Sequence, residues 1–236
     1  MSQNTNAWGQ PVGFALPDWQ PRPRPEFIPF TGDYCFLEPL SAERHGRELY
    51  AAYALAEDDR DWTYMFAQPF KDEAAYLAYA RQIENGPDPM HFAVIDKESR
   101  RAVGTLALMR IEPTHGVMEI GHVAFSPLLK QTRMATEAHY LLMRYAFEQL
   151  GYRRYEWKCD SCNQPSRNAA LRLGFQLEGI FRQAIVYKGR SRDTSWFSII
   201  DSEWPQVKLG FERWLSADNF DAGGRQRNRL EALRQG

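Results

Sequence analysis

One stretch of the chain, from Val117 to Phe175, constrains the fold more than any other. A strand-like run, residues 118–127, leads through a basic turn at 130–136 into a segment whose apolar residues take helical spacing. Those residues lie at positions i, i+3, i+4, i+7, i+8 and i+12: Ala138, Leu141, Leu142, Tyr145, Ala146 and Leu150. Such spacing is typical of a helix that packs one apolar face on a sheet.

A basic turn that leads into a helix N-terminus is suited to binding an anion. The first amides of a helix have no partner within it, and the helix dipole favours negative charge there. The turn at 130–136 therefore predicts a site for a phosphorylated cofactor or substrate. The alternative is that its basic residues are only solvated charges.

The segments that follow favour the anion site. Residues 163–175 (NQPSRNAALRLGF) come after the strand 154–160, and residues 188–200 come after a further strand. This order resembles the GNAT superfamily of acetyl-CoA-dependent N-acetyltransferases, in particular the branch of ribosomal-protein alanine and serine N-terminal acetyltransferases. The resemblance spans about Asp33 to Trp204 and is carried by Glu119–His122, Ala135–Ala138, Asn163 with Ser166, Gly174-Phe175 with Glu178-Gly179, and Arg182 with Asp193.

Composition is compatible with that fold. With 236 residues, of which 44% are hydrophobic, the chain can bury one sizeable core, and alternating helical and strand patterns favour a single α/β (α+β) domain. The resemblance implies a mixed, mostly antiparallel sheet of about seven strands, splayed at its centre and flanked by helices. A formal net charge of −1 gives no sign of broad electrostatic binding to nucleic acid or a membrane surface.

Other features bear on the compartment. No apolar run approaches the roughly 18 residues of a membrane-spanning helix, and no signal peptide is recognisable. The three cysteines are an odd, sparse set, which favours a reducing compartment and so a cytoplasmic location. Cys159 and Cys162 have CxxC spacing, but no second pair completes a zinc site, so we expect no metal.

The chain divides into three parts. Residues 1–30 carry six prolines, which predicts an extended arm that either wraps around the domain or stays loose; its aromatic residues favour wrapping. Residues 31–204 form the acetyltransferase-like domain. Residues 205–236 form a helical extension, with an amphipathic segment at 207–215 and a charged tail at 223–236 that we expect to continue as helix. Arm and tail either mediate a homodimer or fold back on their own domain.

Local signals place most elements within the domain. Ser41 is expected to cap a helix that runs to about Ala56, and Asp72 a second helix that runs to about Asn85. The strands are expected at 35–39, 91–96, 103–111, 116–125 and 154–160, with an aromatic loop at 62–70.

The resemblance implies a cofactor site on the strand before the turn. A bulge in that strand would free the backbone of Val123, Ala124 and Phe125 to hold pantetheine, with the amide of Val123 or a neighbour polarising the thioester carbonyl. The alternative is an ordinary central strand. The phosphate turn would comprise Lys130, Gln131, Thr132, Arg133, Met134, Ala135 and Thr136.

Arg133 departs from the family pattern because it stands where a glycine normally lets the backbone approach phosphate. Lys130 and Arg133 would compensate by pairing with phosphate directly, and Thr132 would donate its hydroxyl.

Acetyl transfer to an amine needs a base and an acid. By resemblance, Glu119 is the base, and burial would raise its pKa toward neutrality. The family's usual acid, a tyrosine, is replaced by Ala170, so Ser166 takes that role, while Asn163 contacts the cofactor. The alternatives are a structural role for Glu119, and helix capping by Asn163 or Ser166.

The acceptor site is less legible. Trp62 and Tyr64 lie in the aromatic loop that covers the amine in this fold, although core packing explains Trp62 equally well. Arg182 and Asp193 are expected to form a structural pair across a hairpin; the alternative is that they shape the acceptor site. The histidines His122 and His139 are expected to be packing or surface residues.

The resemblance favours direct transfer, without a covalent enzyme intermediate, to the α-amine of a protein or peptide. The alternatives are a small amine such as a polyamine, amino acid or aminoglycoside, or a non-catalytic acyl-CoA-binding module.

Overall fold

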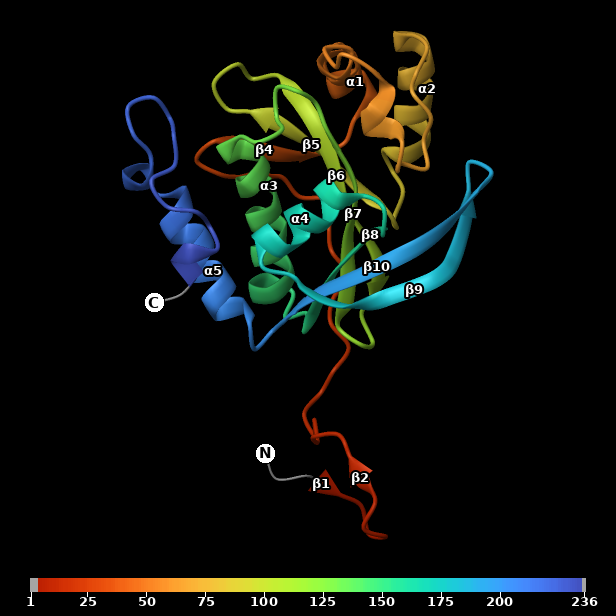
Figure 1. Ribbon diagram of the computed structural model, residues 1–236, viewed down its shortest axis with the longest axis vertical. Helices are drawn as coiled ribbons and strands as arrows, with labels where there is room; N and C mark the ends of the chain where they lie inside the picture. The colour runs from red at the N-terminus through yellow and green to blue at the C-terminus, as the bar shows by residue number, and fades with distance from the viewer. Residues whose placement is uncertain (1–3, 235–236) are drawn as a thin grey trace.

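An open sheet of eight strands runs through the chain in the order β3-β4-β5-β6-β7-β8-β10-β9 (Figure 1). The computed structural model describes residues 4–234, so the first three residues of the predicted arm and the last two of the predicted tail lie outside it. The strands of this sheet are β3 (Phe30–Thr31), β4 (Cys35–Pro39), β5 (Met90–Asp96), β6 (Ala102–Glu112), β7 (Val117–Phe125), β8 (Arg154–Asp160), β9 (Gln176–Tyr187) and β10 (Arg190–Ile200). Neighbouring strands are antiparallel except for β7 and β8, which are parallel. The predicted mixed, mostly antiparallel sheet is confirmed, with the short β3 as an additional edge strand.

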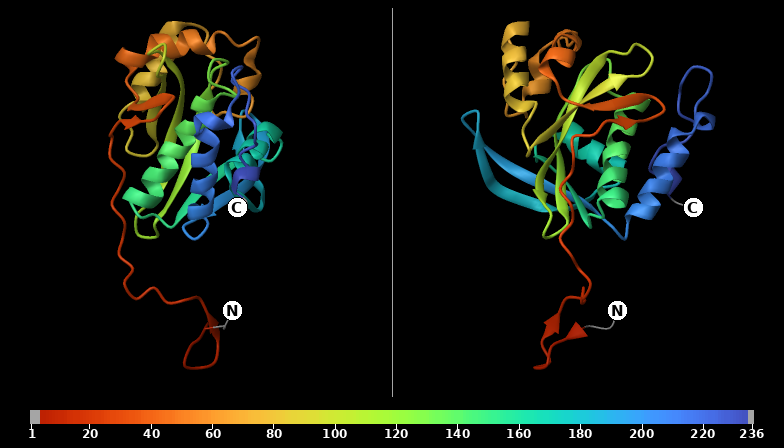
Figure 2. Two further views of the ribbon diagram at one scale, coloured as in Figure 1. Left: turned by 90° about the vertical axis from the view of Figure 1, so that its left-hand side faces the viewer. Right: turned by 180° about the vertical axis from the view of Figure 1, so that it is seen from behind.

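Helices cover both faces of the sheet (Figure 2). They are α1 (Ala42–Tyr53), α2 (Glu73–Ile83), α3 (Arg133–Arg144), α4 (Gln164–Leu173) and α5 (Trp204–Leu215). Alternation along β5 shows the two faces, because Phe92 and Val94 join the core cluster of α3, α4 and α5, whereas Ala93 and Ile95 join that of α1 and α2.

The predicted helix signals act locally as expected. The side chains of Ser41, Asp72 and Thr132 cap α1, α2 and α3 by accepting a hydrogen bond from a first-turn amide. The apolar stripe of α3 is buried against the sheet and continues through a π-helical turn, η2 (Tyr145–Gln149). Gly174 ends α4 in the left-handed region at φ 108°, which a glycine adopts without a Cβ clash.

The N-terminal arm wraps the domain over only part of its length. Trp19 donates its indole N–H to the carbonyl of Thr114 at 2.9 Å, and Phe30 packs against Tyr145 with ring centroids 4.9 Å apart. Nearer the N-terminus, β1 (Asn4–Thr5) and β2 (Pro11–Val12) form a small hairpin that stands away from the body (Figure 1). Residues 19–30 thus lie against the domain, whereas this hairpin does not, and its Trp8 is 83% exposed.

The C-terminal segment folds back onto the domain. Helix α5 packs beside α3 (Figure 2), and Leu230 is fully buried. Along the chain between α5 and Leu230 lie the short 3-10 helix η3 (Ala217–Asn219) and a bridge that pairs Phe220 with Gln226. The predicted helical tail is wrong, because residues 223–234 form turns and one 3-10 turn, η4 (Ala232–Arg234). Among residues 4–234, no helix combines the length and apolar character needed to cross a bilayer.

Candidate active site

The parallel strands β7 and β8 separate near the middle of the sheet. They pair only from Val117–Ile120 to Arg154–Trp157, and both then continue without pairing to each other. On its other side, β8 pairs with β10 along its whole length. The backbone of β7 beyond Ile120 is therefore unpaired on the side that faces β8, which leaves amide and carbonyl groups available to a ligand.

A bulge lies at this point of separation. Gly121 is opposite Ala107 and Ala124 is opposite Thr105, so His122 and Val123 together occupy the place of one residue on β6. His122 has a φ of 48°, in the left-handed region that few non-glycine residues adopt. Its imidazole Nδ1 lies 3.1 Å from Nε2 of His91. The bulge and splay that the resemblance implied are both present.

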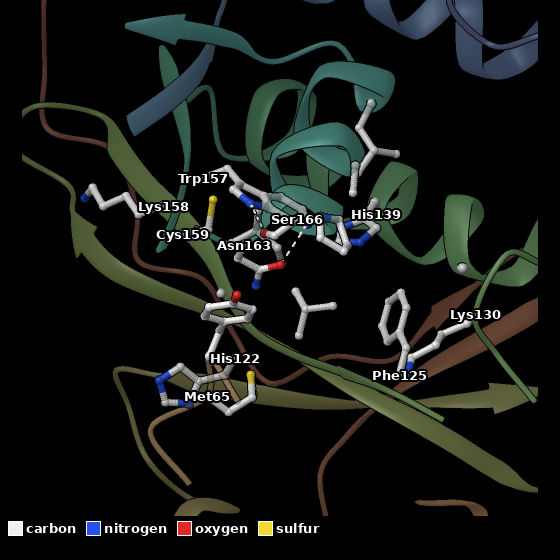
Figure 3. Close-up of a pocket in the computed structure, with 18 of the residues that line it drawn as sticks. Met65, His122, Phe125, Lys130, His139, Trp157, Lys158, Cys159, Asn163 and Ser166 are labelled. Atoms are coloured by element: carbon white, nitrogen blue, oxygen red, sulfur yellow. Dashed lines mark hydrogen bonds between the residues drawn. The ribbon is translucent and has the colours of Figure 1, made fainter. Parts of the chain in front are cut away.

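The separation opens into a cavity of about 1990 Å³. In Figure 3, His122 and Met65 lie on one side of it, and Trp157, Asn163 and Ser166 lie on the other. We call one part the helical end, lined by the start of α3, by Arg172 of α4 and by residues between Trp214 and Gln226. We call the other part the strand end, lined by β7, β8, β9, β10 and the loop from Arg60 to Ala67.

The N-terminus of α3 faces the helical end. The hydroxyl of Thr132 accepts a hydrogen bond from the amide of Ala135 at 3.2 Å and donates one to the carbonyl of Leu129 at 2.7 Å. The amides of Arg133 and Met134 have no partner within the helix. The ammonium of Lys130 forms an ion pair with Asp61 of the 3-10 helix η1 (Asp59–Trp62). Thr132 thus serves as a cap, and Lys130 is held by a carboxylate.

Three arginines gather at the helical end. The guanidinium of Arg133 stacks 3.5 Å from the ring centroid of Phe220, which carries this side chain away from the turn. Arg172 donates a hydrogen bond to the hydroxyl of Thr136 at 3.1 Å, and burial lowers the pKa of its guanidinium. Arg225 lines the same wall. Within residues 4–234, no carboxylate lies within ion-pair distance of these three arginines. The helical end therefore has cationic groups available for an anion.

The start of α4 places a hydroxyl group on the wall of the cavity. Ser166 accepts a hydrogen bond from the indole N–H of Trp157 at 3.0 Å, so its own hydroxyl hydrogen is left to donate elsewhere. The side chain of Asn163 caps α4 by accepting from the amide of Ser166 at 3.1 Å. The neighbouring Cys159 is a thiol of raised pKa, because burial outweighs the opposing effect of the nearby Ser166 hydroxyl.

A buried carboxylate lies at the strand end. An oxygen of Glu119 is 2.9 Å from the ammonium of Lys158 and 3.2 Å from Nε of Arg110. Lys158 also bonds Glu156 at 2.6 Å and lies 3.8 Å from the ring centroid of Trp196. Burial raises the pKa of Glu119, and the attraction of Lys158 and Arg110 offsets only part of that rise.

Comparison with known protein families identifies the family of this chain. The sequence model of the Acetyltransf_3 family, the acetyltransferase (GNAT) domain, matches residues 36–176. The chain belongs to the GNAT family. It is an acetyl-CoA-dependent N-acetyltransferase, and the resemblance seen in its sequence is confirmed.

Solved structures and curated relatives agree with this assignment. A GCN5-related N-acetyltransferase from Brucella melitensis is 48% identical with a TM-score of 0.92, covering 94% of this chain and 100% of that one. A probable GNAT-family acetyltransferase from Chromobacterium violaceum is 42% identical with a TM-score of 0.76, covering 83% and 98%. The uncharacterized N-acetyltransferase YnaD of Bacillus subtilis is 25% identical over 165 residues, covering 70% of this chain and 95% of its own length.

In this GNAT acetyltransferase, most residues predicted for the site line the one cavity. They are Glu119, Val123, Phe125, Lys130, Gln131, Thr132, Arg133, Ala135, Thr136, Asn163, Ser166 and Tyr64. The side chain of Met134 packs against the core, and Ala124 accepts a hydrogen bond from the Tyr53 hydroxyl at 3.1 Å through its carbonyl.

The loop over the strand end divides its aromatic residues between two roles. Trp62 packs edge-on against Phe70 and Tyr53, at centroid distances of 5.2 and 5.7 Å, and does not line the cavity, as the packing alternative expected. Tyr64 does line it, and its hydroxyl donates to the carbonyl of Cys162 at 3.2 Å. Lys188 donates to the carbonyl of Trp62 at 2.7 Å. The loop is thus held against both α4 and the β9–β10 turn.

Two other expectations need correction. Asp193 accepts a hydrogen bond from the amide of Gln183 at 2.7 Å and forms no ion pair with Arg182; the pairing of β9 with β10 is irregular here, since Arg192 is opposite Ile185 but Thr194 is opposite Phe181. Both histidines line the cavity: His139 packs between Phe125 and Trp157, and His122 lies at the bulge.

Sequence reasoning missed the residues that come from outside the matched family domain. Phe220, Gly224 and Arg225 line the helical end, although their sequence shows only a charged tail. No local pattern signals such residues, because their role depends on where the chain folds back.

Proposed function

We propose that this GNAT acetyltransferase transfers the acetyl group to the α-amine of a protein or peptide. The observation that carries the proposal is the joining, in one cavity, of an unpaired β7 backbone, a helix N-terminus and a strand end large enough for a second ligand. A volume of about 1990 Å³ exceeds the roughly 300–1,000 Å³ of a typical small-molecule pocket. The cavity can therefore hold a cofactor together with an extended acceptor.

The residues present fit acetyl-CoA. The unpaired backbone of Val123 and Phe125 suits the amides of pantetheine, and the first amides of α3 suit phosphate. Arg133, Arg172 and Arg225 add charge for the phosphates from a direction that the usual glycine turn does not use. Bound there, acetyl-CoA supplies the thioester from which the acetyl group is transferred.

In the proposed mechanism Glu119 is the base and Ser166 the acid. The raised pKa of Glu119 brings its proton affinity closer to that of a base useful near neutral pH. It takes a proton from the acceptor amine, directly or through one water, while the hydroxyl of Ser166 donates a proton to the leaving thiolate. Ser166 stands in the first turn of α4, where the helix dipole favours a negative charge.

Direct transfer is also what the cavity's cysteine supports. Burial raises the pKa of Cys159, so its thiol is protonated at neutral pH and is a poor nucleophile. The amine then attacks the thioester within a ternary complex, without an acetylated enzyme. The free cysteines further support a cytoplasmic location.

The charge of the strand end favours peptides over polyamines. Asp61 is paired with Lys130, and Glu119 is paired with Lys158 and Arg110. Asp160, the third carboxylate of the cavity, forms no ion pair with any described residue, but it accepts hydrogen bonds from Tyr187 and Cys162 and stands near the buried cation Arg192. A site that selects polyamines needs unpaired acidic groups.

A thiol-release assay tests the proposal. Acetyl-CoA is offered with N-terminal peptides, polyamines, amino acids and aminoglycosides, and thiol release is followed for each. Release with peptides that have a free α-amine, and not with the same peptides blocked at that amine, supports the proposal. Release only with polyamines or aminoglycosides contradicts the peptide assignment. Tight acetyl-CoA binding with no release on any amine indicates a non-catalytic module.

A further inference from the structure

Strand β10 presents alternate residues to the strand end. Trp196, Thr194 and Arg192 all line the cavity, as residues two apart on one strand should. Thr194 pairs with Asp160 of β8, at the level where β7 and β8 have already separated. Arg192 lies two residues farther along β10, about 7 Å from that level.

Arg192 is a buried cation without a carboxylate partner. Its residue is only 7% exposed, and its Nε donates to the hydroxyl of Thr194 at 3.1 Å. Among the described residues, none forms an ion pair with it or accepts a hydrogen bond from its two terminal nitrogens. Those nitrogens are not enclosed by protein atoms, so they open onto the cavity.

The nearby acid on β8, Asp160, forms no direct ion pair with Arg192 and is hydrogen-bonded to other groups. Asp160 accepts hydrogen bonds from the hydroxyl of Tyr187 and from the amide of Cys162, both at 2.8 Å. The rings of Phe66 and Tyr187 each lie 5.8 Å from the guanidinium carbon. Arg192 is therefore held between aromatic side chains with the paired N–H groups of its fork unused.

A buried guanidinium without a partner destabilises the folded protein unless a ligand of opposite charge pairs with it. Its planar fork matches the two oxygens of a carboxylate better than any single charge does. The two terminal nitrogens of Arg192 have no partner among the described residues, and Glu119 is already paired with cations. The strand end therefore has a position suited to an anion rather than to a cation.

We propose that Arg192 binds a carboxylate of the acceptor, and that the acceptor class is peptides with an acidic group close to the α-amine. This inference rests on the proposed function and adds its substrate class. The amine would lie at the splay and the carboxylate several bonds away at Arg192. Two sources have this chemistry: an Asp or Glu side chain near the N-terminus, or the terminal carboxylate of a short peptide.

Matched acceptors separate the two sources. One pair is a C-terminally amidated peptide beginning Ser-Asp against the same peptide beginning Ser-Asn. The other is the dipeptide Ser-Ala with a free carboxylate against its C-terminal amide. For each pair the ratio of kcat/KM, acidic over neutral, is measured with the full chain and acetyl-CoA.

Arg192→Gln and Arg192→Lys are compared with Arg190→Gln, an exposed arginine on the same strand that does not line the cavity. We expect at least one pair to give a ratio of about tenfold or more in the wild type, from a bidentate charged contact. The ratio should fall close to one in Arg192→Gln, take an intermediate value in Arg192→Lys and persist in Arg190→Gln. A wild-type ratio near one for both pairs, or an unchanged ratio in Arg192→Gln and Arg192→Lys, overturns the inference.

Direct binding keeps this outcome separate from that of the proposed function. Binding of the acidic and neutral peptides to the protein with coenzyme A is measured by calorimetry. If no peptide is acetylated, the proposed function fails, yet preferential binding of the acidic peptide that Arg192→Gln abolishes still supports the Arg192 contact. Equal binding of both peptides by the wild type overturns it.

Discussion

Replacing Glu119 by Gln tests the assignment of the base, and the structure gives the expected size of the effect. The substitution keeps side-chain volume, and Lys158 keeps its 2.6 Å bond to Glu156, so no buried cation is left alone. A positioned general base contributes about 10²–10⁴-fold to the rate, so kcat/KM should fall by about that factor. This corresponds to a loss of about 3–5 kcal/mol of transition-state stabilisation. The affinity for acetyl-CoA should stay near that of the wild type, because Glu119 lies at the strand end.

The pH profile makes this test specific. Burial raises the pKa of Glu119, so wild-type activity should rise with pH along a limb centred above the ordinary glutamate value of about 4.3. Glu119→Gln should lose that limb. Lys158→Gln removes the cation that most lowers this pKa, so its limb should move to higher pH.

Stability should change in the opposite sense to activity. A carboxyl group with a raised folded-state pKa contributes stability at pH values below its unfolded pKa, and this contribution is lost as pH rises through the folded value. Glu119→Gln should therefore unfold no more easily than the wild type at pH 7 in urea titrations. Full kcat/KM in Glu119→Gln, or a pH limb unchanged from the wild type, would refute the reasoning.

Three further substitutions and two deletions test other contacts. Ser166→Ala should lower kcat by about tenfold or more while the Kd for coenzyme A changes little, measured by steady-state kinetics and calorimetry; equal kcat contradicts its role as acid. Arg172→Gln should weaken acetyl-CoA about tenfold, since a charge-assisted hydrogen bond contributes about 1.5–3 kcal/mol, and an unchanged Kd rules out a phosphate contact. Glu137 accepts amide hydrogen bonds from Asp33, Tyr34 and Cys35 at 2.6, 2.8 and 2.8 Å, so Glu137→Gln should lower the free energy of unfolding by about 2 kcal/mol or more in urea; a midpoint equal to that of the wild type contradicts this. Deleting residues 1–18 should change that free energy by less than about 1 kcal/mol, whereas deleting 1–30 should lower it clearly, because only the second removes Phe27 and Phe30 from their contacts with Phe92.

Several parts of the fold could be predicted from the sequence because their signals are local. The apolar stripe of α3, the caps Ser41 and Asp72 and the left-handed Gly174 each depend on residues within a few positions of one another. The order of these elements was enough to identify the family. The same local signals gave element ends less well, since α1 stops at Tyr53 and α2 at Ile83, a few residues earlier than predicted.

The candidate site could be predicted only in part from the sequence. Family motifs named Glu119, Asn163 and Ser166, and these do line one cavity. They did not show that Lys130 would be held by Asp61, or that Arg133 would stack on Phe220. Each of these contacts joins segments that lie far apart in the sequence, where no spacing rule applies.

Local patterns were enough to predict that a basic turn and a helix N-terminus follow strand β7 directly, because periodicity and capping act between near neighbours, and the GNAT fold followed from the resemblance of the motif residues. Tertiary structure alone decided which charges stay unpaired. Arg192 is one cation among the 29 lysines and arginines of the chain until folding buries it beside Thr194 and assigns Asp160 to other donors. Whether a charged side chain has an ion-pair partner depends on which groups the fold places within a few ångströms of it, and these distances cannot be read from the composition.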